Sequence, residues 1–476
     1  MCDSFPNWIT KPMIKGISSF SLDAYLLALE GWRRGLNLKW YYDFSQLTDL
    51  KVIGYNPSGK QFSLSDGKKT HFFYRSRGDL VSNEAVEIGT DKMMTKTYLV
   101  NNHVSTPQGK SFNITNSTDD IIDYVSTNME YPVVIKPALG SLGKGVFTNI
   151  STENDIKFAV EQIRNKFGYN DVLVEEYIEG EEFRAYVVGN ELVACTKKIP
   201  PHVIGDGDST ISELITQKNE IRKNNPHLSK KLIKIDDLLE KLLTDKGLSL
   251  DSILNKNEKL ILNRVANTTI GAESININEG IPDDIKKQAV LALQALPCIG
   301  HAGVDMILKD HKAYVLEINP TASYLQHVFP FKGKSINVPQ KIIDYYFPEL
   351  SNKTNNNLVY FNYKKLNEII LNRSVDLVEV TNVEEGKVYV TRLIIEGKVQ
   401  GVGYRNWARS QANKMGINGY VKNLKNGNVV IIAWSTDQNK LNNFKQLCFT
   451  GPKKSNVNKI KELEWDKQLV IGFEKR

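Results

Sequence analysis

The stretch 133–146 constrains the fold of this chain more than any other part of its sequence; it reads Val-Val-Ile-Lys-Pro-Ala-Leu-Gly-Ser-Leu-Gly-Lys-Gly-Val. The β-branched run Val133–Ile135 predicts a buried strand that ends near Lys136. The loop that follows contains the small residues Gly140, Ser141, Gly143 and Gly145. A second apolar run begins at Val146, so the stretch predicts two strands joined by a flexible loop.

This glycine-rich loop is suited to holding phosphates. Glycines let backbone N–H groups approach anionic oxygens closely, and Lys136 supplies a compact positive charge beside them. The loop lacks the Gly-Lys-Ser/Thr sequence at a helix start that defines a Walker A motif, and it does not fit the dinucleotide-binding fingerprint. A plain hairpin without a ligand is the alternative interpretation.

Two segments further along the chain predict a metal site. Residues 303–308 and 314–320 read as two strands joined by a short turn. In such a hairpin Asp305 and Glu317 can lie on neighbouring strands, and Glu317 and Asn319 share a face because side chains alternate with period two. Magnesium prefers hard oxygen ligands, with phosphate oxygens and waters completing its shell. We therefore expect Asp305, Glu317 and Asn319 to hold a divalent cation.

The acidic segment 171–184 contains a strand that runs to Ile178 and is followed by a second strand, Ala185–Val188. A strand edge beside a linker offers backbone donors and acceptors to a flat heterocycle. A carboxylate just beyond that edge can bind two ribose hydroxyls. An acidic hairpin without a ligand is the alternative.

Three helical segments complete the reading of the chain. A helix that starts at Asp91 places Lys92 and Lys96 on one face, where ordinary surface lysines are the simpler explanation. Residues 22–35 and 38–42 predict a helix and a strand, and the Trp32-Arg33-Arg34 cluster predicts a solvated helix end rather than a substrate contact. Apolar residues at helical spacing predict a core-packing helix over residues 229–243.

Composition limits the remaining possibilities. A chain of 476 residues exceeds the size of one ordinary domain. The net charge of +7 suits small anionic substrates, and no nucleic-acid motif or membrane-spanning run is found. The four cysteines show no metal-like spacing, and the N-terminal residues lack a signal sequence. We expect a cytoplasmic protein with reduced thiols and neither nucleic-acid nor membrane partners.

Taken together, these segments resemble the ATP-grasp superfamily of carboxylate–amine ligases, in particular the ligase modules of bifunctional glutathione synthetase and cyanophycin synthetase. The resemblance covers roughly residues 85–350 and rests also on the segments 198–207 and 327–335. It implies ATP and Mg²⁺, with Mn²⁺ as an alternative metal, and it implies an amino acid or peptide as carboxylate and amine substrates. An acyl phosphate would be the intermediate, formed by positioning and charge neutralisation.

The resemblance also assigns roles to individual residues. Lys92 and Lys136 would hold the nucleotide phosphates together with the small residues of the glycine-rich loop. Glu175 would accept from the adenine amino group, Glu182 would bind the ribose, and Asp305, Glu317 and Asn319 would hold magnesium. The adenine edge would be bound by the backbone of Glu176, Tyr177 and Ile178.

Two arginines are candidates for binding the substrate carboxylate or the tetrahedral intermediate, Arg184 and Arg264, because the guanidinium fork matches a carboxylate. The segment around Arg264 departs from the family. Residues 267–272 read Asn-Thr-Thr-Ile-Gly-Ala where Thr-Gly-Gly usually follows the asparagine, and Asn263 stands where the family has an arginine. The identity of the substrates therefore does not follow from the resemblance.

The C-terminal part resembles a second family, the acylphosphatases. The segments that carry the likeness are 393–405, 419–424, 426–429 and 451–452. The turn before Arg405 opens a helix, so backbone N–H groups and the guanidinium can surround a phosphate. The resemblance implies that Arg405 binds phosphate and that Asn423 orients the attacking water. A degenerate docking domain is the alternative.

These observations predict a mixed α/β and α+β chain. The expected parts are an N-terminal α/β domain (1–89), an ATP-grasp domain (90–350), a linker (351–387) and a ferredoxin-like acylphosphatase domain (388–476). The function expected first is an ATP-dependent carboxylate–amine ligase with a fused acylphosphatase. A hydrolase with a regulatory ATP-grasp domain is the alternative. Dimers and tetramers are common in the resembling families, so a homodimer or homotetramer is the expected assembly.

Overall fold

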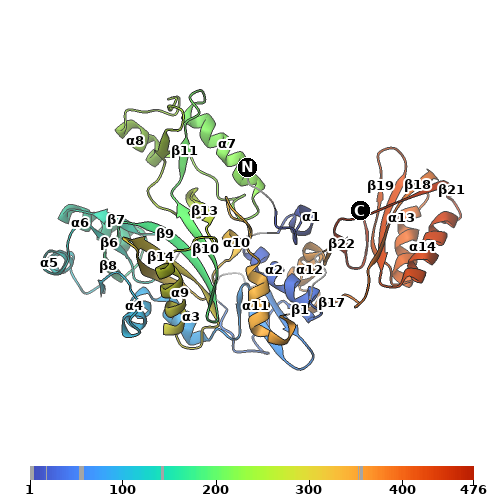
Figure 1. Cartoon of the computed structure of the whole chain (residues 1–476), viewed down its shortest axis with the longest axis horizontal. Helices are drawn as coiled ribbons and strands as arrows, with labels where there is room; N and C mark the ends of the chain where they lie inside the picture. Colours follow the sequence, from blue (N-terminus) through green and yellow to red (C-terminus); the bar gives the residue numbers. More distant parts are fainter. Residues whose placement is uncertain (1–4, 18, 53–57, 141–143, 352, 354–357) are drawn as a thin grey trace. The chain divides into compact units, whose positions relative to one another are not determined.

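The computed structural model describes residues 5–17, 19–52, 58–140, 144–351, 353 and 358–476. The chain forms two compact units, each made of two sequence segments. The first unit contains Arg75–Tyr346 together with the first residues of the chain up to Pro6. The second unit contains Asn7–Tyr74 and Phe347–Arg476. Figure 1 labels many of the helices and strands of both units.

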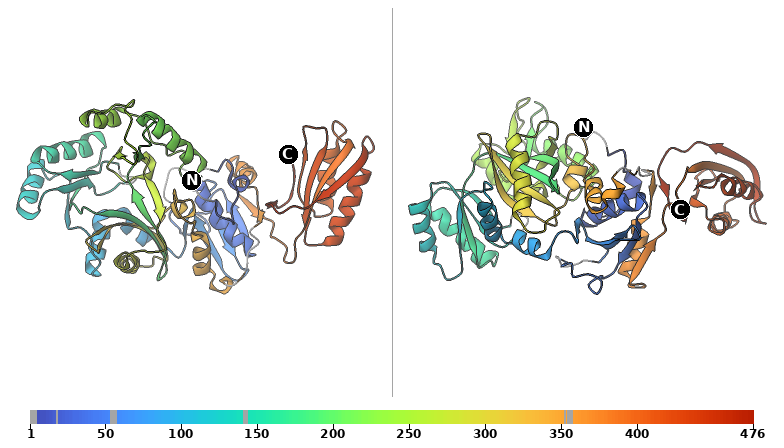
Figure 2. Two further views of the ribbon diagram at one scale, coloured as in Figure 1. Left: turned by 45° about the horizontal axis from the view of Figure 1, so that its top comes forward. Right: turned by 60° about the horizontal axis from the view of Figure 1, so that its bottom comes forward.

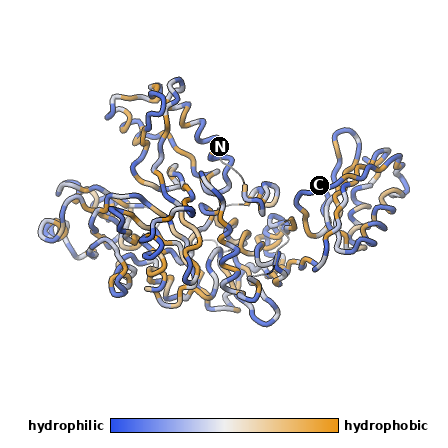
Figure 3. Tube along the Cα trace, viewed as in Figure 1, coloured by the Kyte–Doolittle hydropathy of each residue, from blue (hydrophilic) through white to orange (hydrophobic). Residues whose placement is uncertain are grey.

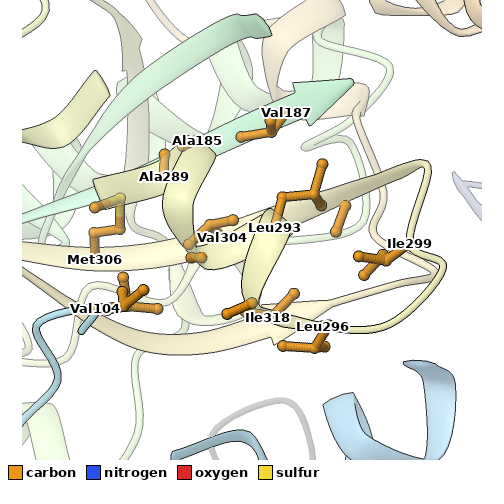
Figure 4. Packing of buried hydrophobic residues seen from close by; sticks show 14 of the residues in the cluster. Val104, Ala185, Val187, Ala289, Leu293, Leu296, Ile299, Val304, Met306 and Ile318 are labelled. Carbon is orange, nitrogen blue, oxygen red and sulfur yellow. The ribbon is translucent and has the colours of Figure 1, made fainter. Parts of the chain in front are cut away.

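A five-stranded antiparallel sheet in the order β13-β10-β9-β14-β15 organises the first unit. Its strands are β9 (Glu181–Val188), β10 (Glu191–Ile199), β13 (Glu273–Asn276), β14 (His301–Lys309) and β15 (Lys312–Asn319). The long helix α9 (Asp283–Ala295) covers one face of this sheet. The side chains between them, among them Ala185, Val304 and Leu293, form a hydrophobic core (Figure 4). The opposite face carries polar side chains.

A smaller sheet holds the strand that the sequence predicts at residues 133–137. Its order is β5-β8-β6-β7, with β5 (Gly109–Phe112), β6 (Val133–Pro137), β7 (Phe147–Ile150) and β8 (Val172–Glu176). Helices α5 (Thr118–Asn128) and α6 (Glu153–Glu161), which continues into a short π-helical turn η1 (Gln162–Lys166), pack on it. Both α-helices begin with a capping box, which fixes their N-termini.

Residues between β10 and β13 form a separate small core. It contains β11 (His202–Ile204), β12 (Lys259–Ile261), α7 (Ile211–Asn224) and α8 (Asp237–Asp245). The predicted helix over residues 229–243 is shorter than expected, because Asp236 caps α8 and the chain before it is not helical. Ile235 is accordingly 43% exposed, whereas Leu239 and Leu243 are buried.

The first unit also contains shorter elements that connect these parts. They are β4 (Arg77–Gly78), α3 (Asn83–Thr90), α4 (Lys92–Asn101), η2 (Thr268–Ile270), α10 (Leu325–Val328) and α11 (Val338–Tyr346). Asp91 caps α4 by accepting from the backbone N–H groups of Met93 and Met94. The predicted helix at this position is therefore present, with Lys92 in its first turn.

The N-terminal part of the second unit is completed by residues from the expected linker. Strands β1 (Asn37–Tyr41), β2 (Gln61–Ser65) and β3 (Thr70–Tyr74) form antiparallel pairs, and β17 (Leu377–Val380) adds to the free edge of β1. The remaining elements are α1 (Lys11–Ile14), α2 (Ser19–Arg33), η3 (Pro348–Leu350), β16 (Val359–Tyr360) and α12 (Tyr363–Leu371). Residues 358–380, which lie within the expected linker 351–387, form part of this folded unit, and the polar residues 352 and 354–357 lie outside the described residues.

The arginines at the end of α2 are buried, and the prediction of a solvated helix end is wrong. Arg33 donates to the backbone oxygens of Val359 (2.7 Å) and Trp8 (2.9 Å). Arg34 forms an ion pair with Glu30 at 2.8 Å, and both side chains are 1% exposed. These arginines satisfy backbone carbonyls and a buried carboxylate, so they hold this part of the unit together.

The C-terminal part has the predicted βαββαβ order. Its sheet runs β21-β18-β20-β19-β23, with β18 (Tyr389–Lys398), β19 (Asn418–Asn423), β20 (Val429–Ser435), β21 (Asn456–Leu463) and β23 (Phe473–Lys475). Helices α13 (Tyr404–Lys414) and α14 (Gln438–Thr450) lie on the same face of the sheet (Figure 2). β22 (Leu469–Val470) pairs with β16. The βαββαβ order confirms the predicted ferredoxin-like fold class. Hydrophobic residues gather along the strands of this sheet (Figure 3).

Candidate functional site

Three lysines and one glutamate meet where α4 approaches the small sheet. Lys96 lies 2.9 Å from one carboxylate oxygen of Glu175, and Lys136 contacts the other. Lys92 donates to the backbone oxygen of Gly140 at 2.8 Å. The exposed fractions are 5% for Lys96, 8% for Lys136 and 3% for Glu175, so one carboxylate serves two buried ammonium groups.

This arrangement leaves positive charge without full compensation. Burial acts to raise the pKa of Glu175, but Lys136 and Lys96 outweigh it and lower that pKa. Burial lowers the pKa of Lys96, and Glu175 opposes the effect only in part because it is shared with Lys136. Burial also lowers the pKa of Lys92, with Glu317 opposing this. An anion placed among these lysines would supply the missing negative charge.

The polar face of the large sheet carries a row of functional side chains. Register places Asn276 opposite Thr196, Thr196 opposite Arg184, Arg184 opposite Asp305, and Asp305 opposite Glu317. Directly opposed residues in antiparallel strands point to the same face, so all five share it. Their chain neighbours, such as Ala185 and Val304, point to the core under α9.

Asp305 is the centre of this row. Its carboxylate contacts Arg184 and lies 2.7 Å from the ammonium of Lys198. Burial acts to raise the pKa of Asp305, but Arg184 and Lys198 outweigh it and lower the pKa to about 2. Asn319 donates to Asp305 at 3.2 Å and to Glu317 at 2.6 Å. Asp305, Glu317 and Asn319 therefore converge as the sequence alternation predicts.

These three side chains suit magnesium. Two carboxylates and an amide oxygen are hard ligands, and they leave positions for phosphate oxygens and water. Cations and an amide N–H neutralise the carboxylates in the present arrangement, which is the charge that a divalent cation would supply. Among the described residues, no group of three His, Cys, Asp or Glu residues could hold a metal.

The residues expected to bind the nucleoside lie at the end of β8 and the start of β9. The backbone N–H of Glu176 donates to Gln108 at 2.9 Å, and Tyr177 and Ile178 follow the end of the strand. Glu182 lies opposite Lys198 in register. Burial raises the pKa of Glu182, and Lys198 opposes this in part. Glu175 faces two lysines rather than an open edge.

The remaining predicted site residues lie in the glycine-rich loop and in the segment after β12. Gly140 and Gly145 have φ angles of 150° and 75°, which favour glycine, whereas Ser141 and Gly143 lie outside the described residues. Arg264 is exposed after β12, and no described ion pair joins it to the polar face. Lys96 is buried, unlike the ordinary surface lysine expected there; its spacing of four from Lys92 is the sequence feature that places it on the same helix face.

A second candidate site lies in the C-terminal domain. Gly401 and Gly403 have φ angles of 75° and 79° in the loop that leads into α13. Gln400 anchors this loop by donating to the backbone oxygens of Leu424 and Asn428, both at 2.8 Å. Arg405 follows in the first turn of α13. The loop and helix start together present backbone N–H groups of the kind that bind anions.

Asn423 ends β19 beside this loop. Its side-chain oxygen Oδ1 is buried and has no hydrogen-bond partner among the described residues. Arg405 donates to the backbone oxygen of Arg476 at 3.0 Å. A buried acceptor without a partner is costly unless a water or ligand completes it. The geometry therefore accommodates a water held by Asn423.

Comparison with known proteins finds two matching families. Residues 89–323 match the family model described as ATP-grasp domain, and residues 391–474 match that described as Acylphosphatase. The cyanophycin synthetase of Crocosphaera subtropica is 32% identical over 275 residues, which cover 56% of this chain and 31% of that protein. The glutathione biosynthesis bifunctional protein of Clostridium perfringens is 29% identical over 334 residues, which cover 65% of this chain and 42% of that protein.

The chain thus spans less than half of the length of either of these curated relatives. Among solved structures, a bifunctional glutathione synthetase from Pasteurella multocida is similar with 26% identity and a TM-score of 0.47. The alignment covers 61% of this chain and 41% of that one. In the part of the chain that the structure describes, no helix is long and apolar enough to cross a membrane.

Proposed function

We propose that this chain, which contains an ATP-grasp domain at residues 89–323 and an acylphosphatase domain at residues 391–474, is an ATP-dependent carboxylate–amine ligase. Its substrates are amino acids or small peptides, and its products are an amide, ADP and phosphate. The relatives named for cyanophycin and glutathione synthesis support this class of reaction.

The observation that carries the proposal is the pairing of two charged clusters in one unit. Lys92, Lys96 and Lys136 gather positive charge against one glutamate. The carboxylates of Asp305 and Glu317 lie on the polar face, and Glu317 acts electrostatically on Lys92. Phosphoryl transfer requires mainly positioning and charge neutralisation, which this arrangement supplies.

The chemistry follows from these groups. A substrate carboxylate oxygen attacks the γ-phosphorus of ATP, the bond to ADP breaks, and an acyl phosphate forms. The amine then attacks the acyl carbon, phosphate leaves, and the amine loses a proton. Lys92 and Lys136 would hold the phosphates, and Arg184 would orient the carboxylate. Magnesium bound by Asp305, Glu317 and Asn319 would neutralise charge on the phosphate oxygens.

ADP release by the purified protein tests this proposal. The assay contains ATP, magnesium and a panel of amino acids and dipeptides, singly and in pairs, and the products are analysed by mass spectrometry. ADP release that requires both a carboxylate and an amine, with a new amide mass, supports the ligase. ADP release without any amide product contradicts it.

The C-terminal domain favours a second activity, the hydrolysis of acyl phosphates. Arg405 would bind the phosphate, and the side-chain oxygen of Asn423, which accepts no hydrogen bond from the described residues, would hold the attacking water. The alternative function is that this hydrolysis is the main activity and that the ATP-grasp domain regulates it. A lack of turnover on a simple acyl phosphate without ATP would argue against that alternative.

The two activities have a natural connection, because the intermediate of a ligase is the substrate class of an acylphosphatase. We hypothesise that the C-terminal domain removes acyl phosphates that meet no amine. Arg405→Ala should lower phosphate release in the absence of amine and leave amide formation intact. Unchanged release would count against the connection.

A further inference from the structure

Three buried polar side chains on the polar face have no hydrogen-bond partner among the described residues. They are the hydroxyl of Thr196, the hydroxyl of Ser274 and both ring nitrogens of His327. Each of the three residues is 0% exposed. Burying a polar group without a partner is costly, so three such groups in one region require an explanation.

The three residues belong to one region of the sheet. Thr196 lies opposite Asn276 in register, and Ser274 lies two residues from Asn276, so both hydroxyls share the polar face. His327 lies on α10, which packs against β10 and β13. Its ring contacts that of Tyr186 with centroids 6.1 Å apart, and Tyr186 shares the polar face with Arg184.

Arg184 borders this region on one side. Thr196 is opposite Arg184 on β10, whereas Asp305 is opposite Arg184 on β14. Arg184 lies over Gly303, where a Cβ atom would come within 2.7 Å of its Nη2. Burial and Arg184 together lower the pKa of His327 to about 3, so its ring is neutral and keeps one N–H donor. The region thus combines a guanidinium with three neutral donors.

We propose that Thr196, Ser274 and His327, bordered by Arg184, line a subsite that binds the unreactive carboxylate of the amine substrate. This inference rests on the proposed ligase function. The three donors have no acceptor in the part of the chain that the structure describes, and a carboxylate accepts several hydrogen bonds at once. Strand spacing places Thr196 roughly 10 Å from Asp305, two strands away, and roughly 14 Å from Glu317, three strands away, so a group bound there stays clear of these expected metal ligands.

The substrate class follows from this position. The carboxylate that reacts with ATP must lie near Asp305 and Glu317 and the phosphate-binding lysines. A second carboxylate held by the hydroxyls would leave the amine of the same molecule directed toward the acyl carbon. The expected acceptor is therefore an amino acid or a peptide with a free carboxylate, and not a simple amine or an amide.

The test compares the standard L-amino acids with their α-carboxamides as acceptors, with ADP release and amide mass as readouts. The wild-type protein should use the best amino acid with a kcat/KM roughly 10-fold or more above that of its carboxamide. Thr196→Val keeps the shape and removes the hydroxyl. It should raise the KM for the amino acid roughly 10-fold, reduce the preference over the carboxamide, and leave the KM for ATP unchanged.

Stability separates this role from a structural one. Thr196→Val should not lower the Tm of the unliganded protein, because it removes a hydroxyl that makes no hydrogen bond to any described residue. Tyr186→Phe is the matched control: its hydroxyl contacts His301 at 3.1 Å on the same face, so its loss should lower the Tm and leave the acceptor preference intact. Ser274→Ala repeats the test at a second position.

The same experiments distinguish failure of the ligase function from failure of the carboxylate subsite. If no pair of compounds yields ADP and an amide, the ligase function itself fails. If the wild-type protein forms amides but uses amino acids and carboxamides equally well, the subsite is refuted while the ligase stands. A Thr196→Val protein with a lowered Tm and an unchanged preference would also overturn the inference, since the hydroxyl would then be structural.

Discussion

Glu175 holds two buried lysines, so its replacement by glutamine should destabilise the first unit strongly. In Glu175→Gln the ammonium groups of Lys96 and Lys136 stay buried without a counter-charge. Exposed fractions of 3% for Glu175 and 5% for Lys96 leave little access for water. Removing one partner of a buried ion pair costs about 3–5 kcal/mol, and we expect a loss near the lower value because part of Lys136 remains accessible.

The assay is urea denaturation of the full chain. Only the unfolding transition whose midpoint rises on addition of ATP is analysed, because that transition reports on the unit that binds ATP. The matched control is Glu176→Gln, next in sequence and exposed, which should change the free energy of unfolding by less than about 0.5 kcal/mol. ATP should raise the stability of Glu175→Gln more than that of the wild type, because its phosphates replace the lost negative charge.

The stabilisation that Glu175 provides should also depend on pH. The pKa of Glu175 is lowered in the folded state, so its contribution to stability is present at neutral pH and is lost as the pH falls through the folded-state pKa. The difference between wild type and Glu175→Gln should therefore shrink on acidification. A Glu175→Gln protein as stable as the wild type at pH 7 would refute the account of the lysine cluster.

Three further predictions address the sites and the core. Asp305→Asn should reduce ADP release by about 100-fold or more, since it removes a charge that faces Arg184 and Lys198, while hydrolysis of a simple acyl phosphate stays unchanged as the internal control. Asn423→Ala should lower that hydrolysis about 100-fold without lowering the Tm, because its Oδ1 makes no hydrogen bond to the described residues; a large Tm loss would contradict this. Leu293→Ala should cost about 2–5 kcal/mol in chemical denaturation, as Leu293 is 2% exposed in the core under α9.

The sequence predicts the hairpin of β14 and β15 well because the alternation of side chains in strands is a local rule. Asp305 and Glu317 lie opposite each other, as expected from two strands joined by a short turn. Burial depends on the partner of an element and is harder to foresee. The same helical spacing that placed Lys92 and Lys96 on one face could not show that this face meets a glutamate from β8.

The wrong prediction for Arg33 and Arg34 also arises because burial depends on residues far away in the sequence. Arg33 and Arg34 look like a solvated helix end until residues more than 300 positions away supply carbonyls to them. The hydroxyls of Thr196 and Ser274 carry no sequence signal, since their significance lies in the absence of a partner that only the register of neighbouring strands reveals. Non-local contacts of this kind are what local patterns omit.

The pairing of β17 with β1 has a consequence for synthesis of the protein on the ribosome. β1 ends at Tyr41, but the strand that completes its edge ends at Val380, so the main segment of the first unit, Arg75–Tyr346, is synthesised between them. During synthesis the edge of β1 therefore stays unpaired until the ribosome has made this inserted segment and then β17. A chain that ends at residue 350 lacks β17, so the edge of β1 stays exposed and we expect this chain to aggregate. A chain that ends at residue 387 retains β17 and should not.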